Sequence, residues 1–248
     1  MASGNMTSGS SSTGSAAGTA SGAARPAAGS PGAAEGAARP SQQTPAPGAA
    51  PPPAATGPSG EVLLSDDFED GDDEGWIADV ADGDDLVGQW SVVTADQGHV
   101  YAQRDNSFDD ESWSVGGDVR WTDVSVETRF RFTAVSNMED ATVMLALRFR
   151  SKDEYYYLEY GGDGSLKIRK RFDGSDDESS SDELDRVATL GQWIKLRFVA
   201  KGSSLSAYVD DALVGSGAVD TDLASGGIAL GVQENAAVEF DDVHVTRP

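Results

Sequence analysis

The chain has no cysteine and only two histidines among its 248 residues. Without cysteine it can form neither a disulfide framework nor a thiol nucleophile, and two histidines leave little material for a catalytic triad. No apolar run reaches the roughly 18 residues that a membrane-spanning helix needs, so membrane insertion is not expected. Phosphate-binding and dinucleotide-binding glycine motifs are missing too. These absences leave binding proteins, structural proteins and carboxylate-based enzymes.

Positive charge is also scarce. Lys and Arg number 18 against 42 Asp and Glu, which gives a formal net charge of -24. Residues 1–60 hold only Arg25, Glu35 and Arg39, so 16 of the bases and 41 of the acids lie after residue 60. The summed field of so acidic a protein repels phosphate, and we therefore expect no nucleic-acid partner. Such acidity suits a soluble protein at high salt, or one that collects divalent cations.

Residues 1–60 are built almost wholly from Gly, Ala, Ser, Thr and Pro. This composition buries too little apolar surface to offset the entropy of ordering, so the segment is predicted to be a disordered linker. Its expected role is a tether to a surface or to a protein partner. Residues 61–248 are then predicted to form one folded domain.

The folded part alternates apolar and polar residues with a period of two. In Val143–Arg150 the apolar residues Val143, Leu145, Leu147 and Phe149 alternate with the others, and in Leu166–Phe172 the alternate positions are apolar except for Lys170, which predicts strands with one buried face. Between them, Gly161–Gly164 offers the positive φ angles that a tight antiparallel connection needs. Further strands are expected at 89–93, 99–103, 119–132, 155–160, 192–200, 205–209, 213–216, 227–232 and 238–245, and loops at 105–117 and 173–185. About ten to thirteen short strands and no helix predict an all-β sandwich or barrel.

Several of these segments carry a resemblance to a known group of proteins. They are DDFED (66–70), RWTDVSVETRFRF (120–132), MLALRFRSKDEYYYLEY (144–160) and FDDVHV (240–245). In this order they resemble the concanavalin A-like lectin/glucanase sandwich, and more narrowly its laminin-G-like and 3-keto-disaccharide-hydrolase-like domains. The resemblance covers residues 61–246. It implies an antiparallel two-sheet jelly-roll sandwich in a secreted bacterial polysaccharide-active protein.

What the resemblance implies about function is broader. Members of this fold bind glycans, bind proteins or cleave glycans, so all three functions stay open. The location it implies is extracellular or at the cell surface, although no basic start and no apolar core follow Met1. Our leading prediction is a non-catalytic carbohydrate-binding module. The alternatives are a hydrolase or lyase of the same fold, and a structural or adhesive surface protein.

The same resemblance implies a structural calcium ion where the first and last strands meet. The positions that correspond here are Asp67 and Glu69 at the start, with Asp241 and Asp242 at the end. Calcium takes six to eight oxygen ligands, and adjacent strand ends can supply several. The alternative is a pair of exposed acidic residues at each end.

Basic residues occupy the polar positions of the predicted strands. The nine are Arg129, Arg131, Arg148, Arg150, Lys167, Arg169, Arg171, Lys195 and Arg197. Guanidinium forks bind carboxylates and hydroxyl groups, and aromatic rings stack on sugars. We therefore predict a face that binds a polysaccharide or oligosaccharide, with an acidic glycan as one possibility. Its predicted residues are Arg129, Arg148, Arg150, Tyr155, Tyr157, Glu159, Lys167 and Arg169, with Trp113 as a stacking ring in a loop. The alternative is cross-strand pairing of these bases with Glu127, Glu159 and nearby Asp.

A glycosidase needs two carboxylates at a defined spacing. Glucanases of the resembling fold carry Glu-x-Asp-x-Glu on a central strand, and this chain has no such strand. Glu159 stands alone on its predicted strand. The sequence therefore favours binding over catalysis and keeps Glu159 as the carboxylate of the enzyme alternative.

Overall fold

The computed structural model describes residues 60–78, 89–107, 110–219, 222–233 and 236–248, all of which belong to one compact unit. These residues form 15 β-strands and no helix, so this part of the chain offers no helix that could cross a membrane. The predicted linker lies outside the described residues, except for Gly60.

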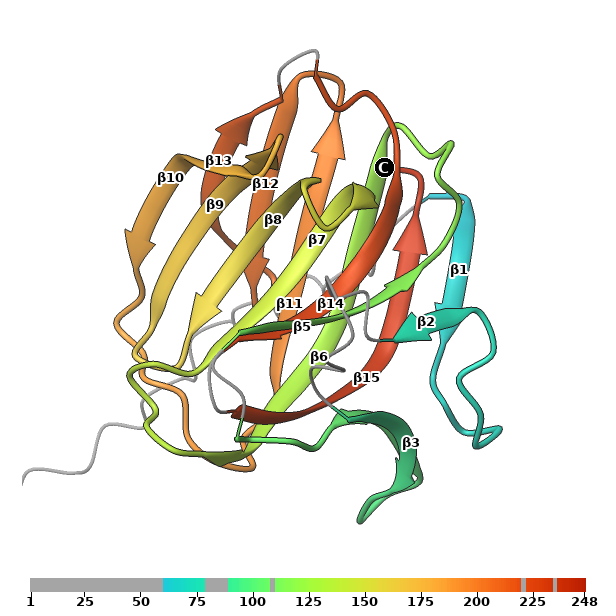
Figure 1. The fold of residues 1–248 in the computed structure, drawn as a ribbon, viewed down its shortest axis with the longest axis vertical. Coiled ribbons are helices and arrows are strands. Elements are labelled where there is room, and N and C mark those ends of the chain that lie inside the picture. The colour runs from blue at the N-terminus through green and yellow to red at the C-terminus, as the bar shows by residue number, and fades with distance from the viewer. Residues whose placement is uncertain (1–59, 79–88, 108–109, 220–221, 234–235) are drawn as a thin grey trace, which may run out of the picture. The chain divides into compact units, whose positions relative to one another are not determined.

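The strands form two antiparallel sheets that pack face to face as a jelly-roll sandwich (Figure 1). Sheet A runs in the order β13-β12-β11-β6-β15-β4-β3, with β1 also paired to β15. Its strands are β1 (Val62–Asp66), β3 (Trp90–Thr94), β4 (His99–Gln103), β6 (Val124–Val135), β11 (Ile194–Lys201), β12 (Ser204–Val209), β13 (Ala212–Ala218) and β15 (Ala236–Thr246). Sheet B runs β10-β9-β8-β7-β14-β5-β2. Its strands are β2 (Trp76–Ala78), β5 (Glu111–Gly116), β7 (Thr142–Ser151), β8 (Glu154–Gly161), β9 (Ser165–Phe172), β10 (Ser175–Glu183) and β14 (Gly227–Gln233).

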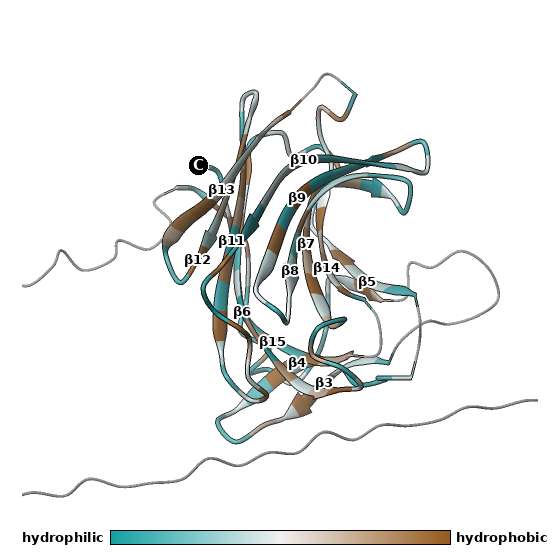
Figure 2. Cartoon of the chain, turned by 90° about the vertical axis from the view of Figure 1, so that its left-hand side faces the viewer, coloured by the Kyte–Doolittle hydropathy of each residue, from teal (hydrophilic) through white to brown (hydrophobic). Residues whose placement is uncertain are grey.

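The predicted alternation places the core between the sheets. On β6, Val126, Phe130 and Phe132 point inward and are buried. The ring of Phe130 meets Tyr160 of the opposite sheet at 5.4 Å between centroids. Removing such a buried ring costs about 3–5 kcal/mol, because both apolar transfer energy and packing are lost. Figure 2 shows apolar residues on the strands of both layers.

The three consecutive antiparallel strands predicted on either side of Gly161–Gly164 are confirmed. Strand β8 pairs with β7 on one side and with β9 on the other, both antiparallel. In the turn before β9, the N–H of Gly164 donates to the carbonyl of Gly161 at 2.9 Å, and Gly164 has a φ of 94°. The strands predicted at 89–93 and 99–103 pair as the hairpin β3–β4, and those predicted at 205–209 and 213–216 pair as the hairpin β12–β13.

Three segments differ from the sequence prediction. Residues 175–183, predicted as a loop, form the edge strand β10, since their backbone pairs with β9 along its length. Residues 111–116, also predicted as a loop, form β5 between β14 and β2. Residues 119–123, predicted as strand, precede β6 instead, and the N–H of Trp121 bonds the carbonyl of Asp118 in a turn.

Candidate functional site

The outer face of sheet B carries a layer of apolar side chains, here called the aromatic layer. It consists of Trp113, Met144, Ala146, Phe149, Tyr155, Tyr157 and Ala229, all buried. These positions alternate with core residues on the same strands, so the layer lies on the side of the sheet away from the sandwich core. Phe149 stacks on Tyr155 with 5.0 Å between centroids. A Cβ at Gly231, opposite Trp113 on β14, would stand 2.5 Å from the indole, so glycine there makes room for the ring.

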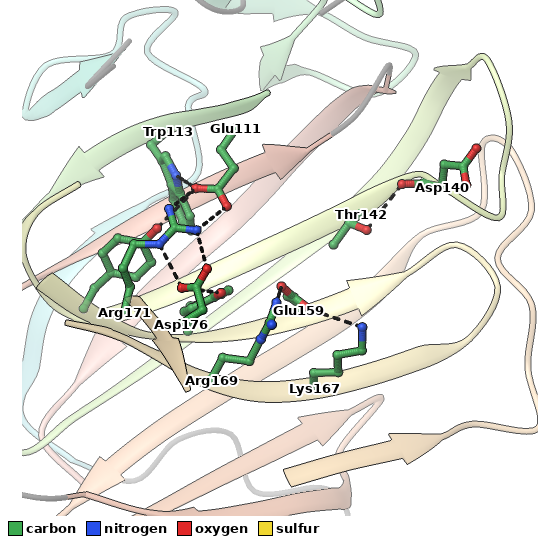
Figure 3. Close-up of polar contacts among 11 residues, drawn as sticks. Glu111, Trp113, Asp140, Thr142, Glu159, Lys167, Arg169, Arg171 and Asp176 are labelled. Atoms are coloured by element: carbon green, nitrogen blue, oxygen red, sulfur yellow. Dashed lines mark hydrogen bonds and ion pairs between the residues drawn. The ribbon is translucent and has the colours of Figure 1, made fainter. Parts of the chain in front are cut away.

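Charged residues cover this layer and form a second group, here called the charged network (Figure 3). Its members are Glu111, Glu159, Lys167, Arg169, Arg171 and Asp176. Three come from β9, and the others come from β5, β8 and β10. Antiparallel pairing of these strands therefore assembles residues that lie far apart in the sequence.

Arg171 is the centre of the network. Its Nη1 and Nη2 bind the two carboxylate oxygens of Glu111 at 2.6 and 2.9 Å. Its Nε binds Asp176 at 2.8 Å. Beneath it, the hydroxyl of Tyr155 donates to Glu111 at 3.2 Å, and the hydroxyl of Tyr157 donates to Asp176 at 3.0 Å. The guanidinium is thus fixed by two carboxylates, and the tyrosines hold those carboxylates from below.

Glu159 forms the other half of the network. The residue is 8% exposed and receives Arg169 Nη1 at 2.9 Å, with Lys167 Nζ 3.9 Å away. The Nε of Arg169 is buried and has no hydrogen-bond partner among the described residues. Such an unsatisfied donor is uncommon in a folded protein.

Burial and neighbouring charges shift the pKa values of several groups on this face. Burial raises the pKa of both Tyr155 and Tyr157, so their hydroxyls stay protonated and act as donors. Burial alone would raise the pKa of Asp176, but hydrogen bonds from Arg171 and its charge outweigh burial and hold that pKa below its ordinary value. Asp176 is therefore ionised at neutral pH.

A hollow of about 470 Å³ adjoins the network at the edge of sheet B. It is lined by Ser165, Lys167, Glu178, Ser181, Asp182 and Glu183. Lys167 belongs to both the hollow and the network. The polar surface therefore continues from the network onto β10.

Arg148 does not lie on this face, and that prediction is wrong. The pairing of β7 with β8 shifts register between Leu147 and Ser151, and Arg148 has a φ of 52°. The irregularity turns its side chain inward, where it is 4% exposed. Its Nε and Nη1 donate to the carbonyls of Thr122 and Leu223 at 3.0 and 2.8 Å. Arg148 thus links the segment that contains Thr122 to the segment that contains Leu223.

The predicted aromatic platforms are covered. Trp113 lies on β5 rather than in a loop and is 3% exposed, while Tyr155 and Tyr157 are fully buried. The Cζ atom of Arg169 lies 5.9 Å from the ring centroid of Tyr157. The three rings thus support the network from below.

Arg150 also lies away from the network. It is at the end of β7 and donates to the carbonyl of Ser225 at 2.9 Å.

The nine bases do not form the single face that the sequence suggested. Arg129, Arg131, Lys195 and Arg197 lie on sheet A, whereas the other five lie on sheet B. Each has a carboxylate or carbonyl partner among the described residues. The cross-strand pairing that the sequence offered as an alternative is therefore present.

The four predicted calcium ligands are engaged by other groups. Strands β1 and β15 do pair there, with Asp66 opposite Val243. Asp241 is buried, which raises its pKa, and its carboxylate contacts Arg129, whose Nε also lies 2.9 Å from Asp242. Asp67 accepts the N–H of Glu69 at 3.3 Å, and Glu69 accepts the N–H of His99 at 3.1 Å.

No group of three or more His, Asp or Glu side chains within the described ranges could hold a metal. Arg129 already supplies positive charge to Asp241 and Asp242, which opposes a cation between these two carboxylates. Calcium stays a prediction from the sequence.

Sequence reasoning missed Glu111 and Asp176, and did not assign Arg171 to the ligand-binding set. Both acids lie in segments that were predicted as loops. The only signal for β5 is the short alternation of Ser112 and Ser114 with Trp113 and Val115. That signal is too brief to distinguish a strand from a loop.

Comparison with known proteins identifies the fold. No protein-family model and no curated protein sequence matches the chain. Among solved structures, carbohydrate-binding module CBM66 from Bacillus subtilis matches with a TM-score of 0.55 and 20% identity, over 69% of this chain and 95% of that one. A β-glucanase from Bacillus licheniformis matches with a TM-score of 0.54 and 13% identity, over 77% and 100%.

Domain 4 of AbnA, an extracellular GH43 arabinanase from Geobacillus stearothermophilus, was solved in complex with arabinotriose. It matches with a TM-score of 0.54 and 13% identity, over 76% of this chain and 93% of that one. At these identities the likeness is one of fold. Two antiparallel sheets in this arrangement give the chain the concanavalin A-like sandwich fold.

Proposed function

We propose that this chain is a non-catalytic carbohydrate-binding module that holds a saccharide on the outer face of sheet B. The saccharide would lie over the charged network and in the adjoining hollow. Two solved structures of the same fold support binding of this class: one is named a carbohydrate-binding module, and the other is an arabinanase domain in complex with arabinotriose. The fold alone permits other functions, so the proposal depends on the site.

The observation that carries the proposal is the fixed array of polar groups. Arg171 is held by two carboxylates, and Glu159 is held by Arg169 and Lys167. The side chain of Lys167 is 41% exposed, so part of the array can reach a ligand. Groups fixed in advance lose little conformational entropy when they bind sugar hydroxyls, which favours affinity.

The charge of this face favours a neutral saccharide over an acidic one. The network contains three bases and three acids, whereas the hollow adds Glu178, Asp182 and Glu183. An anionic sugar would meet this surplus of carboxylates and be repelled. Since the aromatic rings are covered, recognition here depends on hydrogen bonds to hydroxyl groups rather than on ring stacking.

The enzyme alternative is weaker on this face. A glycosidase needs a general acid that is protonated near neutral pH, beside a second carboxylate. Arg171 keeps Asp176 ionised, and Glu159 contacts two bases. The charged form of Asp176 has no proton to donate to a leaving group.

Calorimetric titration of the full chain with arabinotriose and other neutral oligosaccharides tests the proposal. We expect one of them to bind, and Lys167→Ala to weaken that binding about tenfold, which corresponds to about 1.4 kcal/mol. Lys152→Ala, in the turn between β7 and β8, is the matched control. Glu159→Gln keeps an oxygen acceptor, so it should alter affinity only modestly.

A sugar-release assay on the matching polysaccharides completes the test. No product is expected from the wild-type chain. Product that is lost in Glu159→Gln would establish the enzyme alternative. If no neutral saccharide binds and the chain associates with itself or a protein, the structural or adhesive alternative holds. We further propose an extracellular or cell-surface location, with residues 1–60 as the tether.

A further inference from the structure

A second hollow, of about 370 Å³, lies on the outer face of sheet A. It is lined by Ser125, Arg197, Val199, Lys201, Ser204, Ser206, Tyr208, Thr246 and Pro248. The lining residues of β6, β11 and β12 alternate with core residues such as Val126, Phe198 and Leu205. The hollow therefore faces away from the sandwich core, on the opposite side of the molecule from the charged network. Figure 2 shows β11 and β12 on the side away from β5.

Two basic side chains line this hollow. None of its lining side chains is acidic, although the chain has a net charge of -24. Arg197 and Lys201 provide two positive charges. Lys201 forms no ion pair with any described residue. Arg197 Nε lies 3.6 Å from Glu127 Oε2, and Lys195 pairs more closely with Asp211, at 2.6 Å. Arg197 therefore has one loosely held acidic partner, and Lys201 is the base whose charge is available to a ligand.

Arg197 is held in place by an aromatic ring. Its Cζ lies 3.7 Å from the ring centroid of Tyr208, which is directly opposite on β12. This cation–π contact fixes the guanidinium at the wall of the hollow without neutralising its charge. The guanidinium therefore keeps hydrogen-bond donors for an incoming anion.

The floor of the hollow contains an unsatisfied hydroxyl. Ser125 is 4% exposed, and its Oγ is buried without a hydrogen-bond partner among the described residues. Burying a hydroxyl without a partner costs about 1–3 kcal/mol, so such a group is normally satisfied. The neighbouring lining residues Ser204, Ser206 and Thr246 also carry hydroxyls. A ligand in the hollow would thus meet two cations above a hydroxyl-bearing floor.

We propose that this hollow binds an acidic sugar unit, a hexuronate, through its carboxylate and hydroxyl groups. The carboxylate pairs with Arg197 and Lys201, and the sugar hydroxyls bond the Ser and Thr side chains of the floor. The net charge of the chain repels long polyanions, so the site suits a short or sparsely charged segment. This inference goes beyond the proposed function, because it concerns a different sheet and the opposite ligand charge.

Calorimetric titration of the full chain with digalacturonate tests the proposal, with neutral α-1,4-galactobiose and sodium acetate as comparisons. We expect digalacturonate to bind, galactobiose to bind at least tenfold more weakly, and acetate to give no measurable heat. Lys201→Gln should weaken digalacturonate binding about tenfold. Lys152→Gln, which removes a lysine from a turn of the other sheet, should leave that binding unchanged.

Ser125→Ala separates the stability of the free protein from the binding of the ligand. Removing a buried, unsatisfied hydroxyl should leave the unfolding midpoint of the free protein unchanged or raise it. The same substitution should reduce the rise in midpoint that digalacturonate causes, because a ligand contact is lost.

Three results would overturn the inference: no digalacturonate binding, equal binding of galactobiose, or binding that both Ser125→Ala and Lys201→Gln leave intact. The proposed function fails separately, through neutral saccharides and Lys167→Ala on sheet B.

Discussion

Arg171 lies across the ring of Tyr155, with 5.4 Å between its Cζ and the ring centroid. The same guanidinium joins Glu111 of β5 to Asp176 of β10. One residue therefore covers the aromatic layer and connects strands near the two edges of sheet B. Arg171 therefore links the carboxylates of this face to the aromatic rings beneath them.

Arg171→Ala should lower the free energy of unfolding by about 2–3 kcal/mol. The substitution leaves Glu111 as a largely buried charge without its cationic partner and uncovers part of Tyr155. Urea unfolding of wild type and variant measures the change. The double substitution Glu111→Gln with Arg171→Met should recover part of the loss, because it removes both charges and keeps the volume. An unchanged midpoint in Arg171→Ala would show that the network contributes nothing to stability.

Asp176 gives a pH dependence whose direction follows from its lowered pKa. Because the carboxylate is more acidic in the folded chain, its contribution to stability is complete above the unfolded pKa, near 4. That contribution is lost as pH falls from about 4 through the lower folded pKa. Asp176→Asn should therefore destabilise the protein at pH 7 and much less at pH 3. Thermal unfolding of wild type and variant between pH 3 and pH 7 measures the difference in stability. A difference that does not change with pH would refute the prediction.

Arg148→Ala should destabilise the fold by about 3 kcal/mol, because the carbonyls of Thr122 and Leu223 lose buried donors. Since Arg148 lies away from the charged network, the affinity of the folded variant for a neutral saccharide should match that of wild type. Denaturant unfolding gives the first quantity and calorimetry below the unfolding transition gives the second. Lost affinity in a fully folded variant would return Arg148 to the binding site that the sequence predicted.

Calcium removal tests the metal site that the sequence predicted. Arg129 pairs with Asp241 and Asp242, so we expect excess EDTA and excess Ca²⁺ to give the same unfolding midpoint. Differential scanning calorimetry of the full chain provides the measurement. A higher midpoint with Ca²⁺, which disappears in Asp67→Asn and in Asp242→Asn, would establish the site at those carboxylates.

Much of the fold could be read from the sequence, because alternation is a local property. The segments 143–150 and 166–172 show this alternation, and the structure contains them in β7 and β9. β10 could not be recognised in this way, since Ser175–Glu183 has no apolar alternation. Its strand conformation arises from backbone pairing with β9 and from the contact of Asp176 with Arg171, and both depend on a neighbouring strand.

The residues of the candidate sites were also predictable only where the pattern is local. The sequence by itself determined the all-β class, the acidic charge and the residues that face outward on regular strands, such as Lys167 and Arg169. Only the tertiary structure decided that Arg148 turns inward, that Trp113 is covered, and that the bases separate onto two sheets. A register shift of one residue within a strand moves a side chain to the other face of the sheet. The assignment of strands to sheets determines which charged side chains come into contact. Neither is encoded in a local pattern, because both depend on which strands become neighbours.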